Sequence, residues 1–318
     1  MEQRRSGRQK CSKGGEKLIR ISQLKLPITH TKAQLEKKIA KTLKNPGNSF
    51  TYEIKKQSLD CRHKNDKIFV YTVDVTIRDE QKLAKKVNNN NIMLTKEKPY
   101  EFPSPGETPL LHSPVIVGSG PAGLFCGWYL AKAGYCPIIL ERGEEAEKRQ
   151  KTVENFWKNG VLDPESNVQF GEGGAGTFSD GKLNTLVKDP YGRNHEVLKR
   201  FVAAGAPEEI IYQQKPHLGT DVLVGIVEKM RHEIEEMGGK FCFRSKVTDL
   251  IFENNTLKEI EINNDKRIPA QVCVLAPGHS ARDTFEMLQK RGVYMEPKSF
   301  AVGLRIEHLQ EMINMDLY

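Results

Sequence analysis

The chain has 318 residues and a formal net charge of +8, with 38% hydrophobic and 28% charged residues. This balance is typical of globular proteins and excludes the collagen-like, wholly disordered and disulfide-scaffold classes. The length suggests about two domains. No apolar run approaches the ~18 residues that a membrane-spanning helix needs, so we predict no membrane span.

The six cysteines are scattered, without a CxxC or CxxH pair. Such spacing argues for reduced thiols and against a zinc site. The basic N-terminus is not followed by the apolar segment of a secretory signal. We therefore predict a cytoplasmic protein without a metal centre.

Positive charge is concentrated in the front of the chain. Residues 1–100 contain 24 Lys+Arg and 10 Asp+Glu, whereas residues 101–318 contain 25 and 31. A basic front half on an acidic body indicates either a polyanion-binding attachment or a lysine-rich surface. Residues 1–16, which are basic and almost without apolar side chains, are expected to form a flexible tail.

The pattern over residues 17–87 predicts a small α+β domain of βαββα order, ferredoxin-like in class. Apolar periodicity predicts, in chain order, a strand at 18–22, a helix at 31–43, strands at 50–54 and 68–77 and a helix at 79–87. The last strand lacks the glycine and aromatic motif of RNA-recognition modules, so nucleic-acid binding is not favoured over a docking role. Residues 88–112, rich in asparagine and then proline, are expected to be a linker.

A glycine fingerprint follows. An apolar strand runs into Gly118-x-Gly120-x-x-Gly123, after which a helix and a second apolar strand lead to Glu141. Gly118 permits the tight turn, and Gly120 lets a pyrophosphate approach the helix N-terminus, where the dipole favours anions. Glu141 is placed to accept hydrogen bonds from a ribose. We predict that residues 113–318 form a dinucleotide-binding α/β domain.

Two features favour FAD. Pro121 and Ala122 after the second glycine resemble flavoproteins, and strands at 240–262 that return to a strand ending in Ala276-Pro-Gly278 resemble the glutathione-reductase-type FAD fold. That resemblance implies that Val247 lies by the adenine and Ala276–Gly278 near the flavin nucleotide. Arg142, next to Glu141, is a further candidate cofactor contact.

Longer motifs lie between and after these segments. They include Val168-Gln-Phe-Gly-Glu-Gly-Gly-Ala-Gly176, Lys215-Pro-His-Leu-Gly-Thr-Asp221 and Phe300-Ala-Val-Gly-Leu-Arg-Ile-Glu-His308. Together with the fingerprint they resemble the bacterial NAD(FAD)-utilizing dehydrogenase family, over about residues 17–318. The resemblance implies an FAD-dependent oxidoreductase whose flavin carries the redox chemistry, with NAD(P)H as a candidate electron donor.

The same resemblance implies that the glycine-rich stretch faces the flavin. It makes Gly173 and Gly174 candidate cofactor contacts and Lys182 a candidate fixed cation beside a reduced flavin. His217 is a candidate proton donor. The other candidate polar groups are Thr177, Ser179, Asp180, His279 and Arg282. Thr220 or Asp221, and Ser280 with Asp283, are expected instead to cap the helices that begin there.

The chain contains no Gly-Asp dipeptide of the kind that closes such flavin sites. We therefore expect an FAD domain whose C-terminal part is missing. Two other functions stay open: an RNA-modifying flavoprotein that uses the basic front half, and a non-catalytic nucleotide-binding fragment. The sequence itself names no substrate and no electron-transfer partner.

Overall fold

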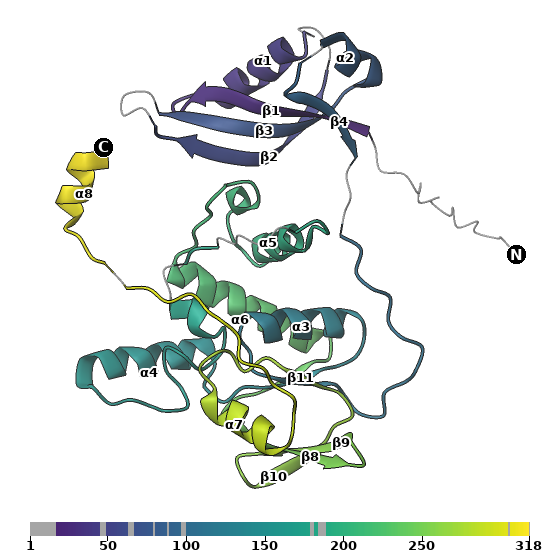
Figure 1. Ribbon diagram of the computed structural model, residues 1–318, viewed down its shortest axis with the longest axis vertical. Coiled ribbons are helices and arrows are strands. Elements are labelled where there is room, and N and C mark those ends of the chain that lie inside the picture. The colour runs from purple at the N-terminus through teal and green to yellow at the C-terminus, as the bar shows by residue number, and fades with distance from the viewer. Residues whose placement is uncertain are drawn as a thin grey trace, which may run out of the picture.

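The computed structural model describes residues 17–44, 49–62, 67–78, 80–87, 89–96, 100–178, 181–183, 189–304 and 306–317. The predicted flexible tail at 1–16 and the candidates Ser179 and Asp180 lie outside these residues. Figure 1 shows an antiparallel sheet with two helices, formed by the first hundred residues, and a larger α/β body formed by the rest.

The front sheet is antiparallel and has the strand order β2-β3-β1-β4. Its elements are β1 (Lys17–Pro27), α1 (Lys32–Thr42), β2 (Thr51–Asp60), β3 (Ile68–Thr76), α2 (Glu80–Val87) and β4 (Ile92–Lys96). The predicted βαββα order is therefore present, and β4 extends it to βαββαβ. The expectation that residues 88–112 are all linker was wrong for β4, whose Ile-Met-Leu core pairs with β1.

The front core forms because one face of the central strands is apolar at every second residue. Val73 and Val75 of β3 pack there against Leu35 and Ile39 of α1. The helix begins at a capping box, in which the Thr31 side chain accepts a hydrogen bond from the Gln34 N–H and the Gln34 side chain accepts one from the Thr31 N–H. Local sequence and packing therefore agree on where α1 starts.

The body is built on a parallel sheet of order β11-β5-β6-β7, with helices between its strands, so the predicted α/β fold class is confirmed. Its strands are β5 (Val115–Val117), β6 (Ile138–Leu140), β7 (Lys240–Cys242) and β11 (Cys273–Leu275). Its helices are α3 (Pro121–Lys132), α4 (Ala146–Asn159), α5 (Arg193–Ala203), α6 (Thr220–Glu236) and α7 (Arg282–Lys290), with short 3-10 turns η1 (Ala175–Phe178) and η2 (Glu208–Ile211).

A separate antiparallel sheet of order β10-β9-β8 is inserted between β7 and β11. Its strands are β8 (Val247–Glu253), β9 (Thr256–Ile262) and β10 (Lys266–Pro269). Val247 and Leu250 of β8 pack with Val115 and Leu140 of the parallel sheet in one buried cluster. The predicted three-strand excursion is therefore present, and it packs against side chains of β5 and β6 in the parallel sheet.

The predicted helix caps were wrong. The N-cap of α6 is Gly219 and that of α7 is Ala281, and neither makes a side-chain cap hydrogen bond. Asp221 and Asp283 lie instead in the first turns, where a negative charge is favoured by the helix dipole.

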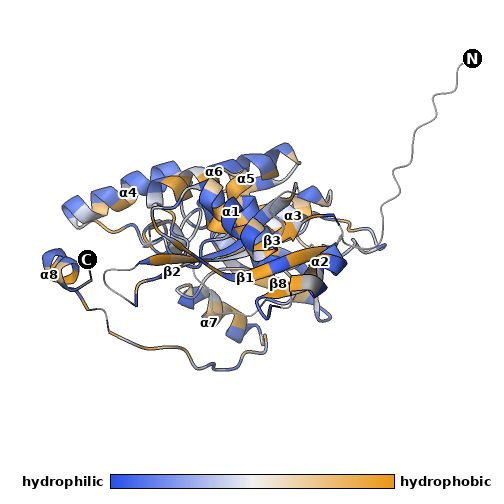
Figure 2. Cartoon of the chain, turned by 90° about the horizontal axis from the view of Figure 1, so that it is seen from above, coloured by the Kyte–Doolittle hydropathy of each residue, from blue (hydrophilic) through white to orange (hydrophobic). Residues whose placement is uncertain are grey.

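The chain between α7 and α8 (Gln310–Leu317) runs away from the body as an extended trace in which hydrophobic residues recur (Figure 2). The side chains of Phe300, Val302 and Leu304 are 83%, 84% and 95% exposed. The described residues of the Phe300–His308 motif therefore lie apart from the buried clusters of the body. Within the described residues, no helix is long and apolar enough to cross a membrane.

The front sheet contacts the body through the outer edge of β2. The Gln57 N–H donates to the Tyr212 carbonyl at 2.7 Å, and the Gln57 carbonyl accepts from the Gln214 N–H at 2.9 Å. Residues 212–214 thus add a short bridge to β2, directly before the segment that contains His217.

Candidate functional site

The strand order of the parallel sheet reverses between β5 and β11. Gly118–Ala122 follow β5, and Ala276–Ser280 follow β11, so both segments leave the carboxyl ends of neighbouring strands. In open parallel sheets, ligands bind at such a switch point. A cavity of about 190 Å³ lies there. It is lined by Gly118, Gly120, Pro121, Ala122, Glu141, Gln169, Phe170, Gly171, Gly174, Ala175 and Ala276–Ser280.

The three fingerprint positions require glycine for different structural reasons. A Cβ at Gly118, whose φ is +98°, would lie 2.4 Å from the Ala276 carbonyl oxygen, and one at Gly123 would lie 1.9 Å from the Gly118 oxygen. Packing alone therefore demands these two. A Cβ at Gly120 would come no closer than 3.8 Å to its nearest neighbour, Gly174 Cα. Since Gly120 is the N-cap of α3, its open side faces the space where a helix N-terminus favours an anion.

The glycine-rich stretch lies against this turn. The Gly173 N–H donates to the Ser119 carbonyl at 2.9 Å. A Cβ at Gly174, whose φ is +66°, would lie 3.1 Å from Gly120 Cα. Two turns that are distant in sequence therefore meet through backbone atoms, and both border the 190 Å³ cavity.

A fully buried arginine, Arg149 of α4, holds the glycine-rich stretch in place. Its guanidinium donates to the carbonyls of Asn167 at 2.9 Å, Val168 at 3.1 Å, Glu172 at 2.7 Å and Gly174 at 2.9 Å. Burial lowers the pKa of Arg149 to about 10, against the opposing effect of the two nearby glutamates, so the side chain stays charged at neutral pH. One cation thus donates hydrogen bonds to four backbone carbonyls of the glycine-rich stretch and the residues before it.

Glu172, in the middle of the glycines, is also buried. Its carboxylate accepts from the Ala146 N–H, in the first turn of α4, at 2.8 Å and from Arg231 Nε of α6 at 2.8 Å. Burial raises the pKa of Glu172, partly offset by these two donors. The side chain ties the stretch to two helices.

Glu141 lies at the end of β6 and is 4% exposed. Its Oε2 accepts from the Ser119 N–H at 2.8 Å and the Ser119 hydroxyl at 2.7 Å, and its Oε1 accepts from the Gly143 N–H at 2.9 Å. A carboxylate can accept about four hydrogen bonds. The predicted ribose acceptor thus braces the fingerprint turn and lines the cavity.

Arg142 points toward acidic partners at the adjoining corner of the sheet. It donates to Glu165 at 2.7 Å and to both oxygens of Asp283 at 3.0 and 2.9 Å, and it stacks on the Phe170 ring. Lys246 pairs with the same two carboxylates. Arg142 and Lys246 border a space of only about 30 Å³, together with Val247.

The two candidate catalytic residues come together. Lys182 and His217 form an isolated antiparallel bridge, flanked by hydrogen bonds from the Leu183 N–H to the Pro216 carbonyl and from the Leu218 N–H to the Gly181 carbonyl. Lys182 lines a second cavity of about 250 Å³ between α3 and α6. The Thr177 side chain lines it too, and its buried hydroxyl has no hydrogen-bond partner in the described part of the chain.

The remaining candidates differ. His279 lines the 190 Å³ cavity, whereas Arg282 begins α7 and is not among the residues that border it. No group of three or more potential metal ligands occurs within the residues that the structure describes.

Sequence reasoning missed Arg149, Glu172 and Ser119. A signal existed for Arg149, because Ala146, Arg149 and Val153 form the buried stripe of α4, and a cation on such a stripe must find acceptors. Nothing in the sequence marks which hydroxyl or carboxylate of a glycine-rich segment turns inward.

Two parts of the chain match known domain families. Residues 116–152 match an NAD(P)-binding Rossmann-like domain, and residues 18–76 match a domain of unknown function, DUF8436. A Clostridium beijerinckii protein described as an uncharacterized protein is 44% identical over 301 residues, which is 94% of this chain. The chain spans 56% of the length of that relative.

Several solved structures resemble parts of the chain. Thermovibrio ammonificans THI4 is 21% identical, covering 57% of this chain and 62% of that one, with a TM-score of 0.38. The Lactococcus lactis thioredoxin reductase is 16% identical, covering 52% and 34%, with a TM-score of 0.29. The Rossmann-like assignment rests on the strand order and on the family match at residues 116–152.

Proposed function

We propose that the chain binds FAD across the β5–α3 turn and belongs to an FAD-dependent oxidoreductase. The observation that carries the proposal is the cavity at the β5–β11 switch point, bordered by the N-terminus of α3 and two glycine-rich turns. A pyrophosphate needs backbone N–H groups, a helix N-terminus and close approach, and this cavity provides all three.

Three further features support FAD over a freely exchanging NAD(P). The antiparallel excursion between β7 and β11 and the Pro121-Ala122 pair resemble glutathione-reductase-type flavoproteins, and the Arg149-braced glycine-rich stretch forms a second wall. In this arrangement Gly118–Gly123 and Gly174 would hold the pyrophosphate, and Gly173, which lines the 250 Å³ cavity, would keep the two turns together through its bond to Ser119. Glu141 would accept from a ribose, and Val247 and Arg142 would border the adenosine end.

A bound flavin supplies hydride or electron transfer. The chain's own residues then have simpler tasks. Lys182 places a cation beside the apolar 250 Å³ cavity, where it would stabilise negative charge, and the bridge to His217 fixes the position of an imidazole next to it. NAD(P)H as electron donor, and the substrate itself, would approach from this side.

Expression of this chain beside the longer Clostridium beijerinckii relative tests the proposal. Visible flavin absorbance is expected in the longer protein, and flavin released by denaturation should be FAD. Gly120→Ala in the relative's equivalent turn should reduce the bound flavin at least about tenfold, because the methyl group intrudes on the pyrophosphate and not on the fold. Gly225→Ala is the control, since a Cβ there meets nothing within 4 Å. Absence of flavin from both proteins would overturn the proposal.

A further inference from the structure

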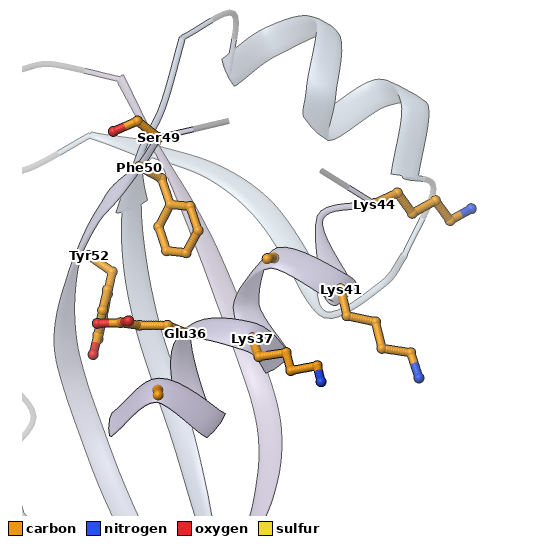
Figure 3. A pocket seen from close by; sticks show the side chains of 9 residues that line it. Glu36, Lys37, Lys41, Lys44, Ser49, Phe50 and Tyr52 are labelled. Carbon is orange, nitrogen blue, oxygen red and sulfur yellow. The ribbon is translucent and has the colours of Figure 1, made fainter. Parts of the chain in front are cut away.

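A separate cavity lies in the front sheet, away from the switch-point site. It has a volume of about 890 Å³ and runs between α1 and the start of β2 (Figure 3). It is lined by Ala33, Glu36, Lys37, Ala40, Lys41, Lys44, Ser49, Phe50 and Tyr52. We call it the α1–β2 groove.

One wall of the groove is a row of cations. Lys37 and Lys41 are four residues apart on α1, about 6 Å along its axis, and Lys44 follows in the turn after the helix. Figure 3 shows the three side chains extending from α1 and the turn after it, on the side away from Phe50 and Tyr52. All three are exposed, and within the described part of the chain none is paired with a carboxylate. Glu36 is the one acidic residue of the lining, so the groove has a net positive charge.

The other wall is aromatic. Phe50 and Tyr52 lie on the strand side with their ring centroids 6.3 Å apart and the rings tilted by 50°. Both rings are half-buried, and Figure 3 shows Phe50 directed into the space beside α1. On the neighbouring strand β3, Phe69 and Tyr71 pack in the front core, which Phe50 and Tyr52 also contact.

We propose that the α1–β2 groove binds single-stranded nucleic acid, with phosphates on the lysine row and an unstacked base against Phe50 and Tyr52. Cations that follow a backbone beside aromatic stacking surfaces are the recurring design of single-strand binding sites. A duplex fits less well, because its bases are stacked and cannot reach recessed rings. The basic first hundred residues would attract a polyanion to this side of the molecule. This inference does not depend on flavin binding.

The test is fluorescence anisotropy of the full chain with labelled ten-nucleotide single strands, of both RNA and DNA, over a salt series. Binding to at least one strand type is expected, and it should weaken steeply as salt rises. Comparison of RNA with DNA shows which source of the same chemistry fits better. A hairpin duplex, an acidic peptide and phosphatidylserine vesicles serve as competitors.

Two kinds of variant measure the contributions of the lysine row and of the aromatic wall to binding separately. Replacement of Lys37, Lys41 and Lys44 by Gln should lower the salt slope by about 2, at about 0.7 per phosphate contact. Phe50→Leu should weaken binding about tenfold and leave the slope unchanged. The matched control replaces Lys258, Lys266 and Lys290, in the body, by Gln and should leave both unchanged. No binding at low salt, equal losses in the control, or tighter binding of any competitor would overturn the proposal.

Discussion

Arg149 holds the glycine-rich stretch by satisfying four backbone carbonyls from inside the body. Arg149→Met should destabilise the chain by about 3–5 kcal/mol, because buried acceptors lose their donors. Arg149→Lys should recover only part of this loss, since an ammonium is a point charge without the planar guanidinium fork. Urea unfolding measures both. Lys151→Met, on the exposed side of the same helix, is the control, and an equal loss there would contradict the assigned role.

Gly118 and Gly123 show what residue spacing can predict. Their positions follow from the requirement for a tight turn after the strand and for close packing of the helix on it. In the structure, a Cβ added at either residue would lie less than 3 Å from a backbone oxygen. The partners of Arg149 and Glu141 could not be read in the same way, because they come from segments whose approach depends on the tertiary fold. The strand β4 was missed since its five residues follow an asparagine run that is typical of loops.

At the scale of elements, ion pairs join α7 to the end of β6 and the start of β8. Arg142 and Lys246 each pair with Asp283 of α7 and with Glu165, and we call these four residues the clasp. Burial favours the neutral form of Asp283, but the hydrogen bonds and charges of Arg142 and Lys246 outweigh it and hold its pKa well below its ordinary value. The same balance lowers the pKa of Glu165. These ion pairs therefore contribute their full stabilisation above pH ~4, where the two carboxyls are ionised even in the unfolded chain. The stabilisation is lost as the pH falls toward the lower pKa values that Asp283 and Glu165 have in the folded chain.

Asp283→Asn should accordingly destabilise the chain at pH 6 and flatten the fall of the free energy of unfolding between about pH 5 and pH 3. Denaturant unfolding at a series of pH values measures this. Asp265→Asn, in the exposed β9–β10 turn, should leave the profile as it is in the unaltered protein. A profile of D283N as steep as that of the unaltered chain would show that the clasp does not set the acid response.

At the scale of the whole molecule, the front sheet and the body share the bridge at Gln57. The Gln57 N–H donates to the Tyr212 carbonyl, and the Gln57 carbonyl accepts from the Gln214 N–H. The edge of β2 therefore fixes the chain just before Pro216 and His217. Those two residues in turn pair with Lys182 and Leu183 beside the 250 Å³ cavity. The front sheet thus supports the backbone of both candidate catalytic residues, whatever it binds in its own groove.

Gln57→Pro tests this support. Proline removes the donor to the Tyr212 carbonyl, and an outward N–H at the edge of a sheet is where proline is tolerated, so the β2–β3 ladder should survive. Loss of one hydrogen bond, worth about 1 kcal/mol, should speed hydrogen exchange of peptides covering residues 212–218 about fivefold. Leu59→Pro removes the next outward N–H of the same strand and should not affect that segment. Gln57→Leu keeps the backbone donor while removing the amide that donates to the Tyr71 hydroxyl, so it should also leave the exchange unchanged. Equal exchange in Q57P and the unaltered chain would mean that the body holds this segment without the front sheet.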